Sequence, residues 1–274
     1  MSRVIPKKDN SSAGFYFQSD KEVMKIIPLF LLILVCTFTA CQKELQTTPA
    51  AGKQLKISFQ NQVDSAAIQL GSTYKNKFGE DYTITMFKYY ISNISLRDTT
   101  GTITNIAGVY HLVDESDSAS KSFILDVPGS NYNQLSFLIG VDSTRNVSGT
   151  QTGDLDPLKG MFWTWNTGYV MAKLEGTSPQ STAPNNNVSI HVGGFKTGEN
   201  TTRLVSPAFP TGTIIQLSSK SISEVVLAAD ANTWFSGAHG LRIADNPVCT
   251  NAGELAVKFA DNYANMFKVA AINN

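Results

Sequence analysis

The sequence predicts an all-β fold, an antiparallel β-sandwich with one short C-terminal helix. Three observations predict it. Apolar and polar residues alternate over many short segments, which is typical of strands that bury one face. The segments between them are rich in Gly, Pro, Asn, Asp and Ser, which turns prefer. A single late segment has apolar residues at a helical spacing.

Residues 55–59 alternate apolar and polar side chains, which predicts the first strand. Residues 82–96 predict one long strand or a pair, because the alternation changes phase at Met86 and Phe87, as it does at a bulge or a break. Further strands are predicted over residues 103–113, 122–127, 135–141, 188–192, 214–217 and 222–228. Many short strands at regular spacing favour one sandwich domain.

The predicted C-terminal helix begins near Asn251. Asn251 and Glu254, three residues apart, resemble a capping box. Its apolar residues lie four apart and would form one stripe: Leu255, Phe259, Tyr263 and Phe267.

One stretch near the middle of the chain contains two of the three tryptophans, a methionine, a tyrosine and a carboxylate-rich turn. The Asp156–Pro157 pair favours an extended or turn conformation at the aspartate. Gly160 then permits the chain to turn into a strand. We predict that this strand runs from Met161 and continues to Gly176.

On that strand, Met161, Trp163 and Trp165 are expected to share one face, because successive side chains point to opposite faces. Two indoles and a thioether make a soft surface that oxidises easily. An indole offers an N–H donor and no basic lone pair, so it does not ligate a metal in the usual way. Unmodified, both tryptophans are equally consistent with large core residues that hold the sandwich together.

The overall composition suits a globular protein with a real core. The chain has 274 residues, 42% of them hydrophobic, and no formal net charge. This balance gives no electrostatic reason to expect nucleic acid or an acidic surface as a partner. The sequence also lacks an internal repeat, a phosphate-binding loop and a nucleic-acid motif.

The N-terminal region predicts export. Lys25 precedes an apolar run at residues 26–35, too short to span a bilayer comfortably, and the signal ends in Phe38-Thr39-Ala40-Cys41. This pattern looks like a bacterial lipoprotein signal, in which Cys41 is lipidated and becomes the first mature residue; a single-pass anchor is the alternative. The predicted organisation is an upstream mis-start (1–23), a signal peptide (24–40), a tether (41–52) and one domain (53–274).

The expected location is therefore the cell envelope, with a lipid anchor in the outer membrane or on the periplasmic face. Cys249 is the one cysteine left in the predicted domain, so no internal disulfide is expected there. Its thiol is interpreted either as buried or as a metal ligand.

The tryptophan stretch resembles the copper-binding MbnP-like domain, a family of exported bacterial proteins. The matching residues are Asp156-Pro157, Gly160-Met161-Phe162-Trp163-Thr164-Trp165, Gly168-Tyr169 and Leu174-Glu175-Gly176. Shorter segments at residues 90–94, 137–142 and 260–267 fit the same family. The resemblance covers roughly residues 53–268.

The resemblance implies copper as a cofactor, bound through histidine and an oxidised tryptophan. His191 is the histidine whose His-Val-Gly setting matches the family. Related proteins oxidise a tryptophan to kynurenine, whose aryl amine can coordinate; here that residue is Trp163 or Trp165. A di-haem enzyme of the MauG type is the implied partner for this oxidation.

The second imidazole stays open. The family leads us to expect a histidine shortly before the terminal helix, where this chain has Cys249. The candidates are His239 and His111, and a Cys249 thiolate is a further option because copper favours imidazole and soft sulfur. From the residues alone, single histidines in a sandwich are more often hydrogen-bonded structural residues.

Copper binding for acquisition or buffering, without catalytic turnover, is the leading functional hypothesis. One alternative is a structural or binding module of the envelope that holds no metal, and another is a small copper redox enzyme. Asp154 and Asp156 also suggest a hard-cation loop, but calcium takes about six to eight oxygen ligands and turn hydrogen bonding explains them better.

Overall fold

The structure, a computed structural model, describes residues 52–149, 151–164 and 168–274. All of them belong to one compact unit, Thr47–Asn274. The predicted leader, the signal peptide and the tether up to residue 51 lie outside the described residues, as do Cys41 and Trp165. Within the described ranges, no helix is both long and apolar enough to cross a membrane.

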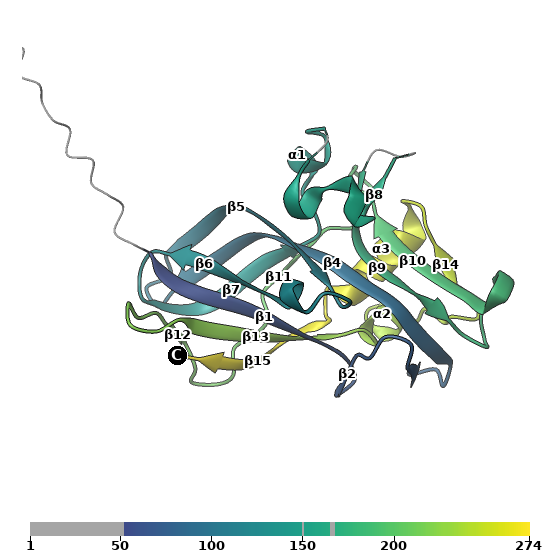
Figure 1. The fold of residues 1–274 in the computed structure, drawn as a ribbon, viewed down its shortest axis with the longest axis horizontal. Coiled ribbons are helices and arrows are strands. Elements are labelled where there is room, and N and C mark those ends of the chain that lie inside the picture. The colour runs from purple at the N-terminus through teal and green to yellow at the C-terminus, as the bar shows by residue number, and fades with distance from the viewer. Residues whose placement is uncertain (1–51, 150, 165–167) are drawn as a thin grey trace, which may run out of the picture. The chain divides into compact units, whose positions relative to one another are not determined.

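Strands of the described residues form two sheets (Figure 1). The five-stranded sheet contains β1 (Lys53–Val63), β2 (Ala66–Ala67), β6 (Ser122–Val127), β13 (Ser223–Asp230) and β15 (Phe267–Asn273). The ten-stranded sheet contains β3 (Thr73–Lys75), β4 (Asp81–Asp98), β5 (Ile103–Asp114), β7 (Asn131–Ile139), β8 (Phe162–Trp163), β9 (Gly168–Thr177), β10 (Asn187–Gly193), β11 (Arg203–Val205), β12 (Ile215–Gln216) and β14 (Val248–Cys249).

Helices are short in this fold. The α-helices are α1 (Ser143–Asn146), α2 (Thr233–Ser236) and α3 (Glu254–Tyr263). The 3-10 helices are η1 (Ser118–Lys121), η2 (Gly153–Leu155), η3 (Pro157–Lys159) and η4 (Pro184–Asn186). The predicted all-β sandwich with one short C-terminal helix, α3, is therefore confirmed.

Strand direction departs from the prediction in two places. Most pairs are antiparallel, but β1 pairs in parallel with β13, and β10 pairs in parallel with β14. Alternation of side chains does not distinguish the two directions, because both kinds of strand have a period of two. The predicted phase change lies inside one long strand: the pairing of β4 with β9 shifts between Ile84 and Met86.

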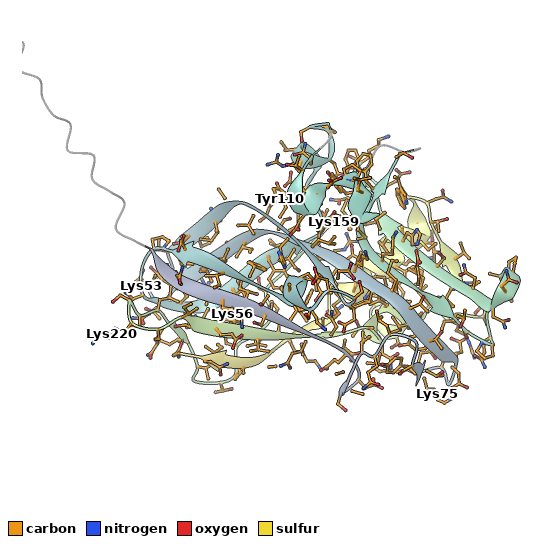
Figure 2. All side chains as sticks on the ribbon, in the orientation of Figure 1. Lys53, Lys56, Lys75, Tyr110, Lys159 and Lys220 are labelled. Atoms are coloured by element: carbon orange, nitrogen blue, oxygen red, sulfur yellow. The ribbon has the colours of Figure 1, made fainter. Side chains whose placement is uncertain are left out.

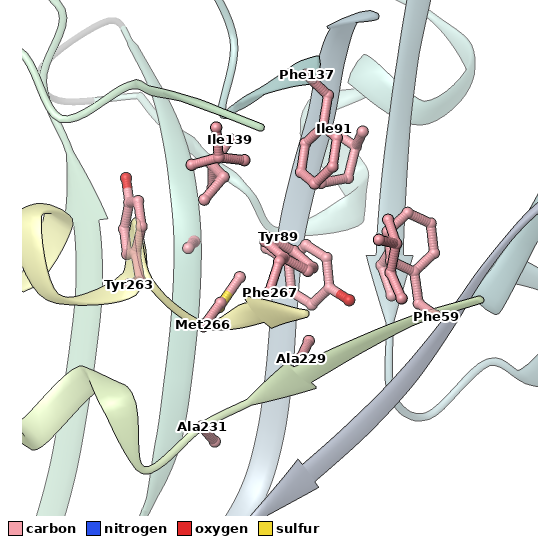
Figure 3. Packing of buried hydrophobic residues seen from close by; sticks show 14 of the residues in the cluster. Phe59, Tyr89, Ile91, Phe137, Ile139, Ala229, Ala231, Tyr263, Met266 and Phe267 are labelled. Atoms are coloured by element: carbon pink, nitrogen blue, oxygen red, sulfur yellow. The ribbon is translucent and has the colours of Figure 1, made fainter. Parts of the chain in front are cut away.

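The main core lies between the two sheets. Figure 3 shows Phe59, Tyr89, Phe137 and Phe267 packed together there, from four different strands. The Phe137 and Phe267 rings meet edge to face at 5.0 Å, and those of Tyr89 and Phe267 at 5.5 Å. Edge-to-face contacts of this kind add to the free energy gained by burial.

The C-terminal helix differs from the prediction at both ends. It begins at Glu254, where Gly253 stands at the N-cap and no side chain caps the helix, so the Asn251 capping box is wrong. It ends at Tyr263, and Phe267 instead begins β15. The spacing of four at Phe267 therefore reflects two elements that bury aromatic rings in the same core.

The tryptophan stretch is a hairpin and does not form the predicted continuous strand. Phe162 of β8 lies opposite Tyr169 of β9, and Trp163 lies opposite Gly168. The prediction of a single strand from Met161 to Gly176 is therefore wrong. An apolar run of this length fits one long strand and two short strands equally well, so the sequence pattern did not distinguish them. Met161 and Trp163 are both buried, as their shared parity predicts.

A capping segment, residues 142–149 and 151–163, covers the face of the ten-stranded sheet that is turned away from the main core. Its Met161 and Trp163 form a second hydrophobic cluster with outward residues of the sheet, among them Tyr90 and Met171. The Tyr90 hydroxyl donates to the Asp154 carbonyl at 2.9 Å. Figure 2 shows Lys159 of this segment and Tyr110 of β5 in the same region.

Glu80 is a buried carboxylate that joins two loops. Its oxygens accept hydrogen bonds from Asn76 Nδ2 at 2.7 Å and from the backbone N–H groups of Ile243 and Ala244 at 2.8 and 3.0 Å. Burial alone would raise the pKa of Glu80, but these hydrogen bonds and the nearby Arg242 charge lower it overall. The ionised form is therefore stabilised by folding.

We expect Glu80→Gln to make the protein less sensitive to acid. A lowered folded-state pKa contributes stability above the ordinary value near 4.5 and loses it as the pH falls further. The unfolding free energy of the unaltered protein should therefore fall more steeply below that pH than that of Glu80→Gln, which will start lower at neutral pH. Denaturant titrations from pH 7 downward measure this difference; parallel curves would contradict it.

Candidate metal centre

A row of polar residues crosses the outward face of the ten-stranded sheet, beside the capping segment. The register places Asp114, Lys88, Lys173 and His191 opposite one another on β5, β4, β9 and β10. Residues directly opposite in an antiparallel pair share a face. Lys88 and Asp114 form an ion pair at 2.7 Å at one end of the row. Lys173 and His191 lie at the other end.

His191 is held by a carboxylate. Its Nε2 lies 2.7 Å from Glu175 Oε1 and 3.4 Å from Ser189 Oγ, and the side chain is largely buried. Burial lowers the pKa of His191, and the Lys173 charge lowers it further against the opposing effect of Glu175. The imidazole is therefore neutral at neutral pH, the form that ligates metals.

Lys173 joins the sheet to the tryptophan hairpin. Its Nζ donates to the carbonyl oxygen of Gly160 at 2.6 Å and lies 3.9 Å from Glu175 Oε1. Burial lowers the pKa of Lys173, and the neighbouring Lys88 charge adds to this. The chain that leads into Trp163 is thus tied to the strand beside His191.

Trp163 packs against β10. A Cβ atom built on Gly193 would come within 2.6 and 2.7 Å of two atoms of the indole ring. Gly193 is therefore required for the close approach of Trp163 to the strand.

Trp163 and His191 consequently occupy the same face. His191 faces outward opposite Lys173, and Trp163, a member of the outward cluster, packs against Gly193, about 6.6 Å further along β10. The structure thus brings one predicted tryptophan and one predicted histidine into the same neighbourhood. Trp165, the other predicted tryptophan, lies outside the described residues.

His111 is placed elsewhere. Its register partner is the core residue Ile91, so it lies on the opposite face of the sheet from Lys88 and Asp114. Both ring nitrogens are occupied: Nδ1 lies 3.1 Å from Asp154 Oδ2, and Nε2 lies 2.6 Å from the Ser120 carbonyl oxygen. This geometry suits a structural histidine that holds the capping segment to β5.

His239 lies beside α3. Its Nε2 is 2.9 Å from Asp261 Oδ2, and Asp261 also accepts hydrogen bonds from Arg203. The buried residues of α3 pack in the main core together with Ile190. His239 is therefore on the core side of β10 and is not brought together with His191.

Cys249 and the two aspartates also have local roles. Cys249 pairs with Ile190 in register and is buried in the main core, where burial raises the pKa of its thiol to about 12. It therefore faces away from His191. Asp156 accepts from the Leu158 N–H at 2.9 Å and Asp154 from the Leu112 N–H at 3.1 Å, which is turn and strand-edge hydrogen bonding.

Comparisons with known proteins match the chain in sequence and in fold. The sequence model of the MbnP family matches residues 52–251. The chain belongs to the MbnP family. MbnP from Methylosinus trichosporium has a similar fold, with a TM-score of 0.54 and 14% sequence identity over 82% of this chain and 99% of that one. No curated protein matches the chain.

MbnP is a copper-associated family, and the question for this chain is which of its side chains are suitable copper ligands. Among the described residues, no group of three or more His, Cys, Asp and Glu side chains is arranged to hold a metal ion. The outward face offers one neutral imidazole, that of His191, beside Trp163. This donor set fits copper if a further nitrogen comes from an oxidised tryptophan, because imidazole and amine nitrogens suit copper.

Lys173 and Glu175 belong to this site, although the sequence pattern did not predict a functional role for either residue. The alternation of Lys173, Leu174 and Glu175 places the two charged residues on one face of their strand. Their contacts with Gly160 and His191 come from segments distant in sequence, so alternation alone does not identify them.

Proposed function

We propose that this MbnP-family protein binds copper at the cell envelope for acquisition or buffering, without catalytic turnover. The observation that supports it best is the shared face of His191 and Trp163. His191 is neutral and held in place, and Trp163 of β8 packs against Gly193, two residues from His191 on β10. Copper, when bound, would be the cargo of the protein and the redox-active metal of the site.

The residues of the chain have separate tasks in this proposal. His191 provides one nitrogen ligand, and the oxidised tryptophan provides the other through its aryl amine. Trp163 is the preferred residue, with Trp165 as the second candidate. Conversion to kynurenine adds one oxygen to the side chain and removes one carbon, which leaves as formate. This oxidation removes four electrons, with water as the source of oxygen, and a di-haem enzyme of the MauG type would pass these electrons to peroxide, which is reduced to water.

Lipid on Cys41 anchors the protein to the membrane in this proposal. The tether that follows keeps the sandwich at the envelope surface, where it can take up copper. The support is the signal-like sequence that ends at Cys41. A multiply acylated cysteine would hold the domain firmly.

The proposal predicts different copper affinities for four samples. Protein from its native host and protein made without the di-haem enzyme are each prepared with and without His191→Ala. The intact mass of the host form should include lipid and a gain of about four daltons from kynurenine. It should bind about one copper, more tightly than the form made without the di-haem enzyme.

His191→Ala should weaken copper binding in both forms by more than the roughly 10–100-fold loss usual for outer-shell changes, because a direct ligand is removed. His239→Ala is the matched control, since it removes an imidazole from the core side of β10, and should leave the affinity unchanged. A competition titration with a copper chelator measures all the samples. Equal affinities for His191→Ala and the unaltered protein would favour the module that holds no metal.

A further inference from the structure

Glu175 contacts the imidazole of His191 directly. It lies on β9 between β4 and β10, with Met86 and Ser189 as its register partners. Its Oε1 is 2.7 Å from His191 Nε2, the shortest contact made by that imidazole. Lys173, two residues away on the same face, lies 3.9 Å from the same oxygen.

The chemistry of this contact decides which imidazole nitrogen carries the proton. A neutral imidazole has one N–H donor and one lone pair, and a carboxylate accepts hydrogen bonds. The Glu175 contact therefore places the proton on Nε2 and leaves the lone pair on Nδ1. Among the described residues, Nδ1 of His191 has no hydrogen-bond partner.

We propose that Glu175 is a positioning residue of the copper site, which holds His191 as the Nε2–H tautomer and directs Nδ1 at the metal. This inference rests on the proposed function. A carboxylate that holds the second nitrogen of a metal-bound histidine fixes the ring orientation and raises the basicity of the ligating nitrogen. The hydrogen bond made by one nitrogen sets which nitrogen is metallated.

The surrounding contacts keep this carboxylate in place. Lys173 is fixed by its bond to the Gly160 carbonyl, at the start of the hairpin that carries Trp163. Glu175 is thus held between this ammonium group and the imidazole. Two hydrogen bonds, Lys173 to Gly160 and His191 to Glu175, and the ion pair of Lys173 with Glu175 connect the hairpin to the histidine.

The test has two arms, and the first needs no copper. Long-range proton–nitrogen NMR spectra of protein labelled with nitrogen-15 in histidine report the tautomer of each ring. The unaltered protein should show His191 as the Nε2–H form. Glu175→Gln keeps an oxygen acceptor and should retain this form, whereas Glu175→Ala should give a mixture with the Nδ1–H form. His239, which also contacts a carboxylate, is an internal reference in the same spectra.

The second arm measures copper affinity of the same variants. Glu175→Ala should weaken binding about 10–100-fold, and Glu175→Gln should restore most of the loss. Asp261→Asn, which alters the carboxylate beside His239, is the matched control and should leave copper binding unchanged. In the unaltered protein, cuprous copper should shift the Nδ1 signal of His191 far more than the Nε2 signal.

Two results would overturn the inference: copper contact at Nε2, or a Glu175→Ala variant with unchanged tautomer and affinity. Failure of the proposed function is distinguishable from both. In that case the unaltered protein binds no copper, while its spectra still show the Nε2–H form. Near-identical backbone spectra of Glu175→Ala and the unaltered protein confirm that folding is intact.

Discussion

Replacing Trp234 with alanine is expected to lower the free energy of unfolding by about 3–5 kcal/mol, a large part of the roughly 5–15 kcal/mol typical of a folded domain. Trp234 is fully buried, and its ring lies 5.6 Å from those of both Phe87 and Tyr263. Its Nε1 donates to Met266 Sδ at 3.3 Å. One side chain therefore joins α2 to β4 and α3, and its removal leaves a large cavity.

Denaturant titrations followed by circular dichroism measure the effect. Trp234→Phe is the matched variant, because it keeps an aromatic ring and loses the N–H contact, and its loss should be clearly smaller. An unchanged midpoint for Trp234→Ala would show that the main core does not depend on this indole.

Gly176→Ala is expected to destabilise the sandwich by at least the roughly 1–3 kcal/mol usual for overpacking, because the obstacle is backbone. Gly176 lies on β9 between β4 and β10, opposite Ile84 and Val188. A Cβ there would lie 1.8 Å from the carbonyl oxygen of Thr83 and 2.9 Å from its carbonyl carbon. The two strands would have to separate beside the irregularity of β4.

Gly240→Ala is the control for this prediction. Its added Cβ would meet the end of the Phe78 ring at 3.3 Å, and a side chain yields more easily than a strand. The same thermal and denaturant scans should therefore show a small change for Gly240→Ala and a severe one, or loss of soluble protein, for Gly176→Ala. Equal midpoints would contradict the close approach of β4 to β9.

Gly176 also belongs to one of the short sequence runs that resemble the MbnP family, and each residue of that run has a physical reason. The Leu174-Glu175-Gly176 run combines a core residue, the carboxylate beside His191 and the glycine that admits β4. Each position has a different requirement. A short motif of this kind is informative because a substitution at any of the three positions meets a different neighbour.

The sequence alone could not decide which histidine supplies the second imidazole. His191, His239 and His111 each lie close to a carboxylate in the folded chain, so this contact does not distinguish them. Which face of the sheet a histidine occupies depends on the register between strands, and register joins residues distant in sequence. His191 stays the predicted ligand, and the structure separates it from the other two.

The positions of most strands and of the late helix were determined by the sequence alone, because alternation and helical spacing are local properties of the chain. So were the family resemblance and the choice of the tryptophan stretch as its centre. The tertiary structure decided the parallel pairs, the hairpin at Trp163, the contact of its indole with Gly193 and the row that brings Lys173 to His191. These features depend on which distant segments become neighbours, and free energy is gained there by burial and pairing across the sheet, which no local pattern encodes.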